Sequence, residues 1–506
     1  MSYLDMDLLS FQLSLLSAWS TTVLGLAVLA LGLLMHWVKN KRRSNYPPEP
    51  FPLPLVGNMF LLDFKNFPES LAKLRTRYGD VFSLKLFFED TVVLNGYNAI
   101  KEGLVTKSED TADRPSIPMF EHLGLHNGIA FTRYGQHWKE QRRFALSTLR
   151  NFGMGKKSME ERVREEAGYL CSAFQDEEGC PFDPFMVLNN AVSNVICSII
   201  FGERFDYTDS SFQRMICLLR TMFELEAEPF TQLYKPFPWL MKMPGPHQKL
   251  FSIQRTYLDF LETIIQKHRQ TWDPAIRRDF IDVFFEEMEK TKDNPSSSFS
   301  EKTLLIVMAD LFVAGTDTTS NTLRWSLLMM LLHPHIQEKV HEEIDRVIGR
   351  DKLPTTEDAS NMPFTNAVIY EVQRYGNILP MALLHMTCRD TNIQGFDIPK
   401  GTTIIPNLTS VLKDETIWKK PYQFYPEHFL DAEGKFVKNE AFIPFSAGRR
   451  ICVGEQLARM DLFIFFTSLL QRFQFHIPDD QPRPRDDPVF TFNLSPRPFQ
   501  VCARVR

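Results

Sequence analysis

The feature that most constrains this chain of 506 residues is one cysteine at the start of a long helical segment. Cys452 lies in Phe445-Ser-Ala-Gly-Arg-Arg-Ile-Cys-Val-Gly454, and residues 455–473 have helical apolar spacing. The helix dipole and unpaired backbone N–H groups there would lower the pKa of the thiol. The two glycines, Gly448 and Gly454, would let the backbone approach a flat cofactor, and Arg450 could meet an acidic group on it. We interpret the segment as a cofactor site; the alternative is a buried inert cysteine, the default for the other six.

A polar cluster interrupts the long apolar segment 299–332, with the sequence Ala314-Gly315-Thr316-Asp317-Thr318-Thr319. Hydroxyls and a carboxylate in mid-helix compete for the backbone hydrogen bonds of the helix and can leave a notch for dioxygen and water. Taken alone, such a cluster is more typical of a solvent-exposed polar turn. The family resemblance that the cysteine segment carries reverses this preference and implies an oxygen-binding notch.

These two segments resemble the cytochrome P-450 superfamily. The first matches Phe-x-x-Gly-x-Arg-x-Cys-x-Gly at every fixed position, and the second is similar to Ala-Gly-x-(Asp/Glu)-Thr-Thr. The resemblance implies a mainly α fold with small β-sheets, haem b as cofactor and Cys452 as the ligand of its iron. A thiolate ligand favours cleavage of the O–O bond. We therefore expect a monooxygenase that inserts one atom of dioxygen into a lipophilic substrate.

The resemblance also implies roles for the polar cluster. Thr318 would donate a hydrogen bond to the oxygen ligand of the iron, and Asp317 would relay protons towards it. Related enzymes often have Glu at the position of Asp317, so the relay would be one methylene shorter here.

The haem propionates need cationic or polar partners, because a dianionic edge cannot be buried unpaired. The resemblance supplies the predicted cofactor-binding residues, which are Arg114, Trp138, Arg142, Ala314, His385, Phe445, Gly448, Arg450 and Cys452. The alternative for Trp138 is a core position, and the alternative for the arginines is a surface charge.

Glu371 and Arg374 are spaced to meet on one helical face. They are similar to the structural Glu-x-x-Arg pair of the superfamily. Its third partner is usually an arginine in Pro-Glu-Arg-Phe, where this chain has His428, so the third hydrogen bond is open.

Over essentially the whole chain the sequence looks like microsomal family 2, especially its subfamily J, whose members oxidise polyunsaturated fatty acids such as arachidonate and also drugs. Epoxidation or hydroxylation of fatty acids is the first expectation, and xenobiotic or steroid hydroxylation is the alternative. A haem-thiolate isomerase and a non-enzymatic haem sensor are alternatives of other classes. The predicted apolar pocket residues are Ile117, Phe120, Phe223, Phe312, Val313, Ile378, Leu379, Met381 and Leu494.

Electrons must come from outside, because the sequence contains no Gly-x-Gly-x-x-Gly dinucleotide-binding segment. The resemblance implies NADPH-cytochrome P-450 reductase, with cytochrome b5 as a further donor. Lys139, Arg143 and Arg449 are the hypothetical docking residues. The formal net charge of -5 argues against nucleic acid as a partner.

The amino terminus predicts a membrane anchor. Residues 11–38 contain no Asp, Glu, Lys or Arg, and the roughly 20 apolar residues that cross a bilayer fit within them. Lys39, Lys41, Arg42 and Arg43 follow at once, so the rest of the chain should face the cytosol. We expect a single-pass protein of the endoplasmic reticulum membrane; a cleaved signal peptide is the alternative.

Three parts follow from this pattern: the anchor with its basic residues (1–45), a proline-rich hinge (46–58) and the catalytic domain (59–506). Five prolines among residues 47–54 enforce an extended path. Helical spacing predicts helices over 134–149, 156–174, 185–201, 247–272, 299–332, 334–348, 362–375 and 455–473. Runs at 81–86, 91–94, 402–405 and 489–494 predict strands. Ser298 and Glu301 predict a capping box.

Seven scattered cysteines without a CxxC pair indicate a reducing compartment. The glycosylation triplets at Asn407 and Asn493 should be unused in a domain that faces the cytosol.

Overall fold

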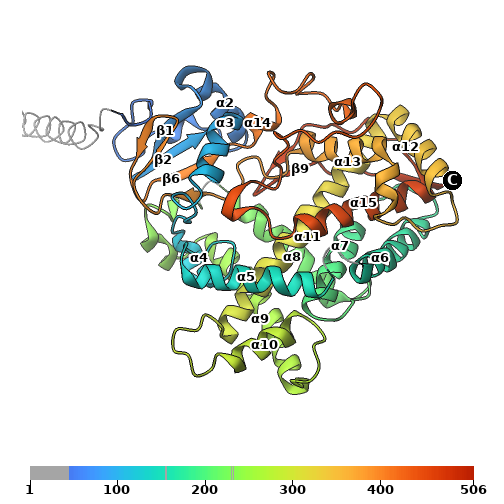
Figure 1. The fold of residues 1–506 in the computed structure, drawn as a ribbon, viewed down its shortest axis with the longest axis horizontal. Helices are drawn as coiled ribbons and strands as arrows, with labels where there is room; N and C mark the ends of the chain where they lie inside the picture. The colour runs from blue at the N-terminus through green and yellow to red at the C-terminus, as the bar shows by residue number, and fades with distance from the viewer. Residues whose placement is uncertain (1–44, 154–156, 229–230, 232) are drawn as a thin grey trace, which may run out of the picture.

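The fold is mainly helical with small sheets, as expected (Figure 1). The computed structural model describes residues 45–153, 157–228, 231 and 233–506, so the predicted anchor lies outside the described residues except for Asn45. The α-helices are α2 Phe67–Tyr78, α3 Gly96–Lys101, α4 Pro118–His122, α5 Gln136–Asn151, α6 Lys157–Gln175, α7 Phe185–Ile200, α8 Ser210–Glu226, α9 His247–Thr271, α10 Phe280–Lys290, α11 Glu301–Leu332, α12 Pro334–Val347, α13 Pro363–Gly376, α14 Thr409–Leu412 and α15 Glu455–Arg472.

The largest sheet has the order β1-β2-β6-β3, with β2 and β6 parallel and the other pairs antiparallel. The strands are β1 Val81–Leu86, β2 Glu89–Leu94, β3 His385–Met386, β4 Thr391–Ile393, β5 Phe396–Ile398, β6 Thr403–Pro406, β7 Phe473–His476, β8 Val489–Phe490, β9 Leu494–Ser495 and β10 Cys502–Val505. The single strand predicted over 489–494 is wrong: β8 and β9 pair antiparallel there as a short hairpin.

Helix α11 is the central element, and it packs against α7, α9, α13 and α15. It begins after Ser300, whose hydroxyl accepts a hydrogen bond from Thr303 N, and it ends where Pro334 starts α12. The predicted capping box is therefore wrong in position, because Ser298 is buried and instead accepts a hydrogen bond from Gln141. Among the described helices only α11 is long and apolar enough to cross a membrane, and most of its apolar stretch is buried within the domain.

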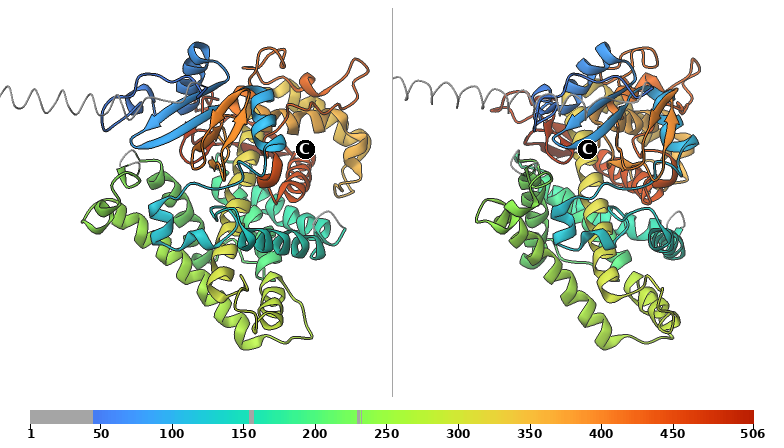
Figure 2. Two further views of the ribbon diagram at one scale, coloured as in Figure 1. Left: turned by 60° about the vertical axis from the view of Figure 1, so that its left-hand side comes forward. Right: turned by 90° about the vertical axis from the view of Figure 1, so that its left-hand side faces the viewer.

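The core has a large helical part and two smaller parts on the faces of the main sheet. In Figure 1, β1, β2 and β6 lie at the upper left and α12, α13 and α15 at the upper right, with α11 between the two regions. Figure 2 shows α9 and α10 projecting from the side opposite the sheet. The interior therefore holds the middle of α11 close to both the sheet side and α15.

The proline-rich hinge lies against the sheet at its start. The hydroxyl of Ser83 in β1 donates to Pro47 O, and Ser83 N donates to Pro48 O. Phe51 and Leu55 are exposed. The backbone of the hinge thus packs on the main sheet, while some of its apolar side chains face the surroundings.

Candidate active site

The cysteine segment enters α15 through a short 3-10 turn, Gly448–Arg450. Cys452 N donates to Phe445 O at 3.1 Å, which folds the segment back on itself. The exposed surface of the Cys452 thiol faces an internal cavity. Burial raises the pKa of Cys452, although the Gly454 N–H and the Arg142 guanidinium act in the opposite direction. The lowered thiol pKa predicted from the sequence therefore stays a prediction for the protein with its metal ion bound, which would stabilise the thiolate.

Packing is one reason for glycine at position 448. Its φ is +75°, and a Cβ there would lie 1.7 Å from the carbonyl oxygen of Leu104. A side chain would force the cysteine segment away from the π-helical turn Glu102–Thr106, which contains Leu104. The close approach of Gly448 to a cofactor stays a prediction.

We call the space in front of Cys452 the inner cavity; it is bounded by α11, α13, α15 and the cysteine segment. Most of the predicted site residues line it: Arg114, Arg142, Ala314, Thr318, His385, Phe445, Arg450 and Cys452. Trp138, Asp317 and Gly448 do not. The structure therefore brings the thiol and the oxygen-notch threonine, which lie far apart in sequence, to one cavity.

Three arginines gather at one edge of the inner cavity. Burial and mutual repulsion lower the pKa of Arg114 to about 9 and that of Arg450 to about 8, while Asp113 acts in the opposite direction on both. Burial also lowers the pKa of Arg142. Several buried cations with so little opposing charge favour an anion at this edge. The residues present therefore fit a planar group with paired carboxylates, such as haem.

Two further predicted propionate partners lie at the same edge. His385 Nδ1 donates to Thr111 O at 2.9 Å, and burial and nearby Arg114 hold the His385 pKa well below its usual value. His385 is therefore neutral, with Nε2 as an acceptor. Trp138 Nε1 donates to Ile129 O at 3.2 Å, and its ring lies 4.1 Å from the guanidinium carbon of Arg450. Trp138 thus supports an arginine from behind, and its contact with a cofactor stays a prediction.

The two predicted catalytic residues are not brought together. Thr318 faces the inner cavity, and its hydroxyl donates to Ala314 O at 2.7 Å. Asp317 points away from it and accepts a short hydrogen bond from Asn493. Burial raises the pKa of Asp317 to about 6, with Arg324 acting in the opposite direction. A relay from Asp317 to Thr318 would require Asp317 to turn.

The Glu371–Arg374 pair is present and fully buried. Arg374 Nε and Nη2 each lie 2.7 Å from a carboxylate oxygen of Glu371. His428 Nε2 accepts from Lys420 N, which leaves Nδ1–H to donate to Glu371 Oε2 at 3.1 Å. His428 therefore supplies the third hydrogen bond that the sequence left open. Arg374 also donates to backbone carbonyls, including Leu412 O, and so ties α13 to the end of α14.

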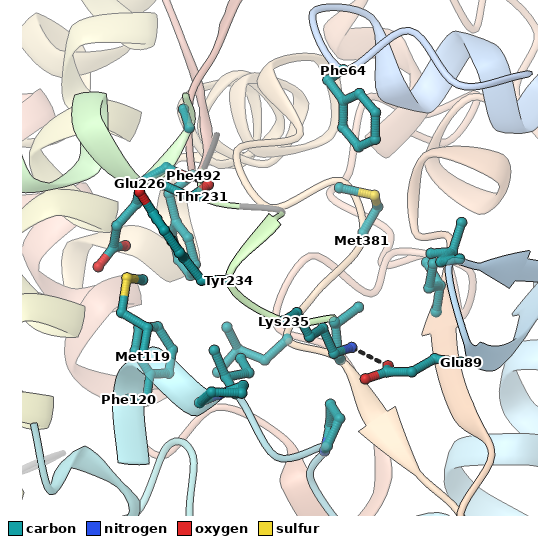
Figure 3. Close-up of a pocket in the computed structure, with 18 of the residues that line it drawn as sticks. Phe64, Glu89, Met119, Phe120, Glu226, Thr231, Tyr234, Lys235, Met381 and Phe492 are labelled. Carbon is teal, nitrogen blue, oxygen red and sulfur yellow. Dashed lines mark hydrogen bonds and ion pairs between the residues drawn. The ribbon is translucent and has the colours of Figure 1, made fainter. Parts of the chain in front are cut away.

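A second space, the outer cavity, adjoins the inner one, since Arg114, Ala382 and Leu383 line both. Its walls are the β1–β2 turn, the region of α4, the connection between α8 and α9, and residues 381–384. Figure 3 shows Glu226, Met119 and Phe120 on one side of it and the ion pair Lys235–Glu89 on the other. The predicted pocket residues that line either cavity are Ile117, Phe120, Ile378, Leu379 and Met381. Phe223, Phe312, Val313 and Leu494 line neither.

Four acidic residues line the cavities, and the sequence patterns predicted none of them: Glu89 and Glu226 at the outer cavity, Asp310 and Asp461 at the inner one. Asp310 of α11 lines the inner cavity, accepts from Ile129 N at 2.6 Å and Ala130 N at 2.9 Å, and has a pKa that burial raises to about 6. Glu226 lines the outer cavity, accepts from Gln254 at 3.0 Å, and has a pKa that burial raises to about 7. The only sequence signal for Asp310 was a lone acid within an apolar helical run.

A family model for cytochrome P-450 matches residues 47–503. The chain belongs to the cytochrome P-450 family. Cytochrome P-450 2D20 of Mesocricetus auratus is 52% identical over 96% of this chain and 98% of its own length. Cytochrome P-450 2D3 of Rattus norvegicus is also 52% identical, over 96% and 98%, and cytochrome P-450 2D6 of Homo sapiens is 51% identical, over 94% and 97%.

These relatives confirm family 2, but their subfamily is D, so the expected likeness to subfamily J is not supported. This P-450 is a monooxygenase that uses haem with a cysteine thiolate ligand, dioxygen and electrons derived from NADPH, which reach members of the family through a redox partner.

Proposed function

We propose that this P-450 oxidises lipophilic compounds that carry a basic amine, a xenobiotic type of substrate, in preference to fatty acids. The observation that carries the proposal is the pair of acidic side chains, Glu226 and Asp310, in the walls of two adjoining and otherwise largely apolar cavities. A protonated amine would gain a charge-assisted hydrogen bond from either carboxylate. A fatty acid carboxylate would be repelled by both.

In the proposed site Cys452 would ligate the haem iron, and Arg114, Arg142 and Arg450 would face the propionates. His385 would lie at the same edge and could donate to a carboxylate once its Nε2 takes up a proton. Bound there, the haem supplies activated oxygen to the substrate. The chain's own residues orient the reactants: Ala314 and Thr318 of α11 border the oxygen side, and the apolar outer cavity excludes water from the substrate. The Thr318 hydroxyl would supply a proton donor on the α11 side of the inner cavity.

Cys452→Ala tests the ligand. We expect the variant to lose the ferrous carbon-monoxide absorption band of thiolate-ligated haem and all monooxygenase activity, because no other thiol lines the inner cavity among the described residues. Cys217→Ala, which removes an exposed thiol on α8, is the control and should keep both. A persistent thiolate band in Cys452→Ala would place the ligand elsewhere.

Glu226→Gln tests the substrate class and its pH dependence. Glu226 has a pKa of about 7, so its carboxylate form grows as pH rises through neutrality, and the affinity for a permanently cationic lipophilic probe should rise with it. Glu226→Gln should remove this pH dependence and raise the Kd about tenfold to a hundredfold. Haem spectral shifts on titration of the probe at several pH values give the Kd.

Glu224→Gln is the matched control, because Glu224 lies on the same helix but is exposed and paired with Arg220. It should bind the probe as the unmodified enzyme does. A Kd for the amine that Glu226→Gln and Asp310→Asn both leave unchanged would contradict the proposal.

Fatty acid oxidation is the second candidate, and Lys235 favours it. This lysine lines the outer cavity and is the cation that a substrate carboxylate could take over from Glu89. If arachidonate is turned over faster than amines, and if its turnover falls in the Lys235→Ala variant, fatty acid oxidation would be favoured. Product analysis with both substrate panels decides between them.

The anchor and electron partner are further parts of the proposal. We expect a single membrane-spanning segment within residues 1–45 in the endoplasmic reticulum, with the domain facing the cytosol. Lys139, Arg143 and Arg449 would meet an acidic reductase surface, although Arg449 already pairs with Glu109. Unchanged reductase coupling after reversal of all three charges would rule this surface out.

A further inference from the structure

The outer cavity carries charges of both signs in a lining that is otherwise largely apolar. Its charged lining residues are Glu89, Arg114, Glu226 and Lys235. Glu226 is the residue to which the proposed function assigns a substrate amine, and Lys235 pairs with Glu89. Figure 3 shows this pair on the other side of the opening from Glu226. The cavity therefore presents a carboxylate on one side and an ammonium group on the other.

Aromatic packing holds Lys235 at the partly exposed side of the cavity, which we call the rim. Lys235 lies in the connection between α8 and α9, and Phe237 follows two residues later. Phe237 packs edge-on against Phe87 and Phe88 of the β1–β2 turn, with ring centroids 6.2 Å apart in both contacts. Glu89 comes directly after these two rings, as the first residue of β2. Because the aromatic contacts do not depend on the ion pair, Lys235 would stay at the rim when its carboxylate partner changes.

Lys235 has donors to spare for a ligand. Its ammonium group carries three N–H donors and pairs, among the described residues, with Glu89 alone. The two side chains are 27% and 39% exposed, so water can replace either partner at little cost. Arg114, the other cation of the lining, instead donates through Nε and Nη1 to three backbone carbonyls. A ligand carboxylate would therefore break fewer existing hydrogen bonds at Lys235 than at Arg114.

Access to water fixes which end of a ligand suits which side. A carboxylate is costly to bury without full pairing, and the rim lets it stay partly hydrated. Glu226 lies deeper, since burial raises its pKa to about 7, and Gln254 donates to it at 3.0 Å. A ligand with its ammonium group at Glu226 and its carboxylate at Lys235 meets the opposite charge at both ends. The reverse orientation would place two carboxylates together at Glu226.

We propose that the outer cavity binds zwitterionic lipophilic compounds lengthwise, with a basic amine at Glu226, a carboxylate at Lys235 and an apolar chain between them. The inference rests on the proposed amine role of Glu226 and adds Lys235 as a second residue that determines specificity. Glu89 is then a resident competitor, which the ligand carboxylate displaces from Lys235. Simple amines and simple fatty acids would each use one half of this site.

A series of ω-(trimethylammonio)alkanoic acids of increasing chain length tests the proposal on the full-length haem-loaded enzyme. Each acid is compared with its methyl ester, which keeps the cation and removes the anion. Haem spectral shifts, or displacement of a spectrally active amine, give the Kd at a pH well above the Glu226 pKa of about 7. We expect the acid to bind about threefold to fivefold more tightly than its ester. This advantage should peak at one chain length, because a linker adds affinity only when it spans both sites.

Three variants assign the effect to a residue. Lys235→Met keeps the apolar stem and should abolish the advantage of the acid while leaving the Kd of the ester unchanged. Glu89→Gln removes the competing carboxylate and should raise the affinity for the acid about twofold to threefold. The opposite signs are decisive, because loss of a merely structural ion pair would shift both variants in the same direction. Lys242→Met is the matched control, since Lys242 is an exposed lysine of the same connection that does not line the cavity, and it should keep the full advantage.

The inference and the proposed function fail in different ways. Ester binding that depends on Glu226, combined with no advantage for the acid at any chain length, would overturn the inference alone. An advantage that survives in Lys235→Met would assign the carboxylate to another cation and would also overturn it. If Glu226→Gln and Asp310→Asn both leave the Kd of the ester unchanged, the amine proposal fails and the inference fails with it.

Discussion

The inner and outer cavities differ in how their walls are held. Helices α11, α13 and α15 bound the inner cavity, and the fully buried pair Glu371–Arg374 ties α13 to the end of α14. Turns and connections bound the outer cavity, and the ion pair across it joins Lys235 and Glu89, whose side chains are 27% and 39% exposed. Solvent weakens such a pair, whereas breaking a buried one strands a charge. Substitutions at the inner cavity should therefore lower the free energy of unfolding, and substitutions at the outer cavity should alter substrate access.

The largest effect on folding should come from Arg374→Ala. The substitution leaves the Glu371 side chain in the core with His428 as its one remaining side-chain donor. It should therefore lower the free energy of unfolding by about 3–5 kcal/mol. Denaturant unfolding followed by circular dichroism measures this. Lys73→Ala breaks the exposed pair Lys73–Glu69 and should change nothing measurable. Similar losses in the two variants would show that the buried pair contributes no more to folding than an exposed one.

Motif spacing predicted the Glu371–Arg374 pair and the place of Cys452 before α15, because each depends on a short stretch of sequence. Glu371 and Arg374 lie one helical turn apart, and Cys452 comes just before its helix. The orientation of Asp317 could not be predicted, because it depends on Asn493, which lies 176 positions away. Such long-range partners leave no pattern in a single sequence.

Acidic residues of the cavity walls were missed for a related reason. Asp310 interrupts an apolar run, whereas Glu226 lies between two other acids, Glu224 and Glu228. An acid in either setting is usually a solvated residue of a helix face. Only the packing of other elements turns it into part of a cavity wall. The need for glycine at position 448 likewise comes from the backbone of Leu104, which sequence spacing does not reveal.

Gly448→Ala should give an intermediate effect. Gly434 has the same φ of +75°, but a Cβ at that position would meet no atom within 4 Å, so Gly434→Ala should cost only the left-handed backbone strain, about 1–2 kcal/mol. Gly448→Ala adds the clash with Leu104 O and should cost more and lower haem occupancy, because it displaces the cysteine segment. Unfolding curves and haem content measure both. Equal effects of the two substitutions would show that the segment tolerates the displacement.

Both asparagines of the glycosylation triplets are buried, Asn407 bonded to Asn95 and Asn493 to Asp317. Neither is accessible in the folded domain. Each serves instead to fix a neighbouring element, which explains why a polar side chain stands there.

The smallest effect should come from Lys235→Ala at the outer cavity. The substitution removes an ion pair that water already screens, so the free energy of unfolding should change by less than about 0.5 kcal/mol. The connection between α8 and α9 keeps its aromatic contacts, because Phe237 packs edge-on against Phe87 and Phe88.

Loss of the ion pair should therefore make the wall of the outer cavity more mobile without widening the cavity. The association rate of a neutral lipophilic ligand should then rise about twofold, with little change in its Kd. Stopped-flow haem spectra measure that rate. Raising ionic strength should reproduce the effect in the unmodified enzyme and add nothing in Lys235→Ala, since salt screens the same pair. A salt dependence that survives the substitution would mean that other charges control access, and the outer wall would then be held by more than its one cross-cavity ion pair.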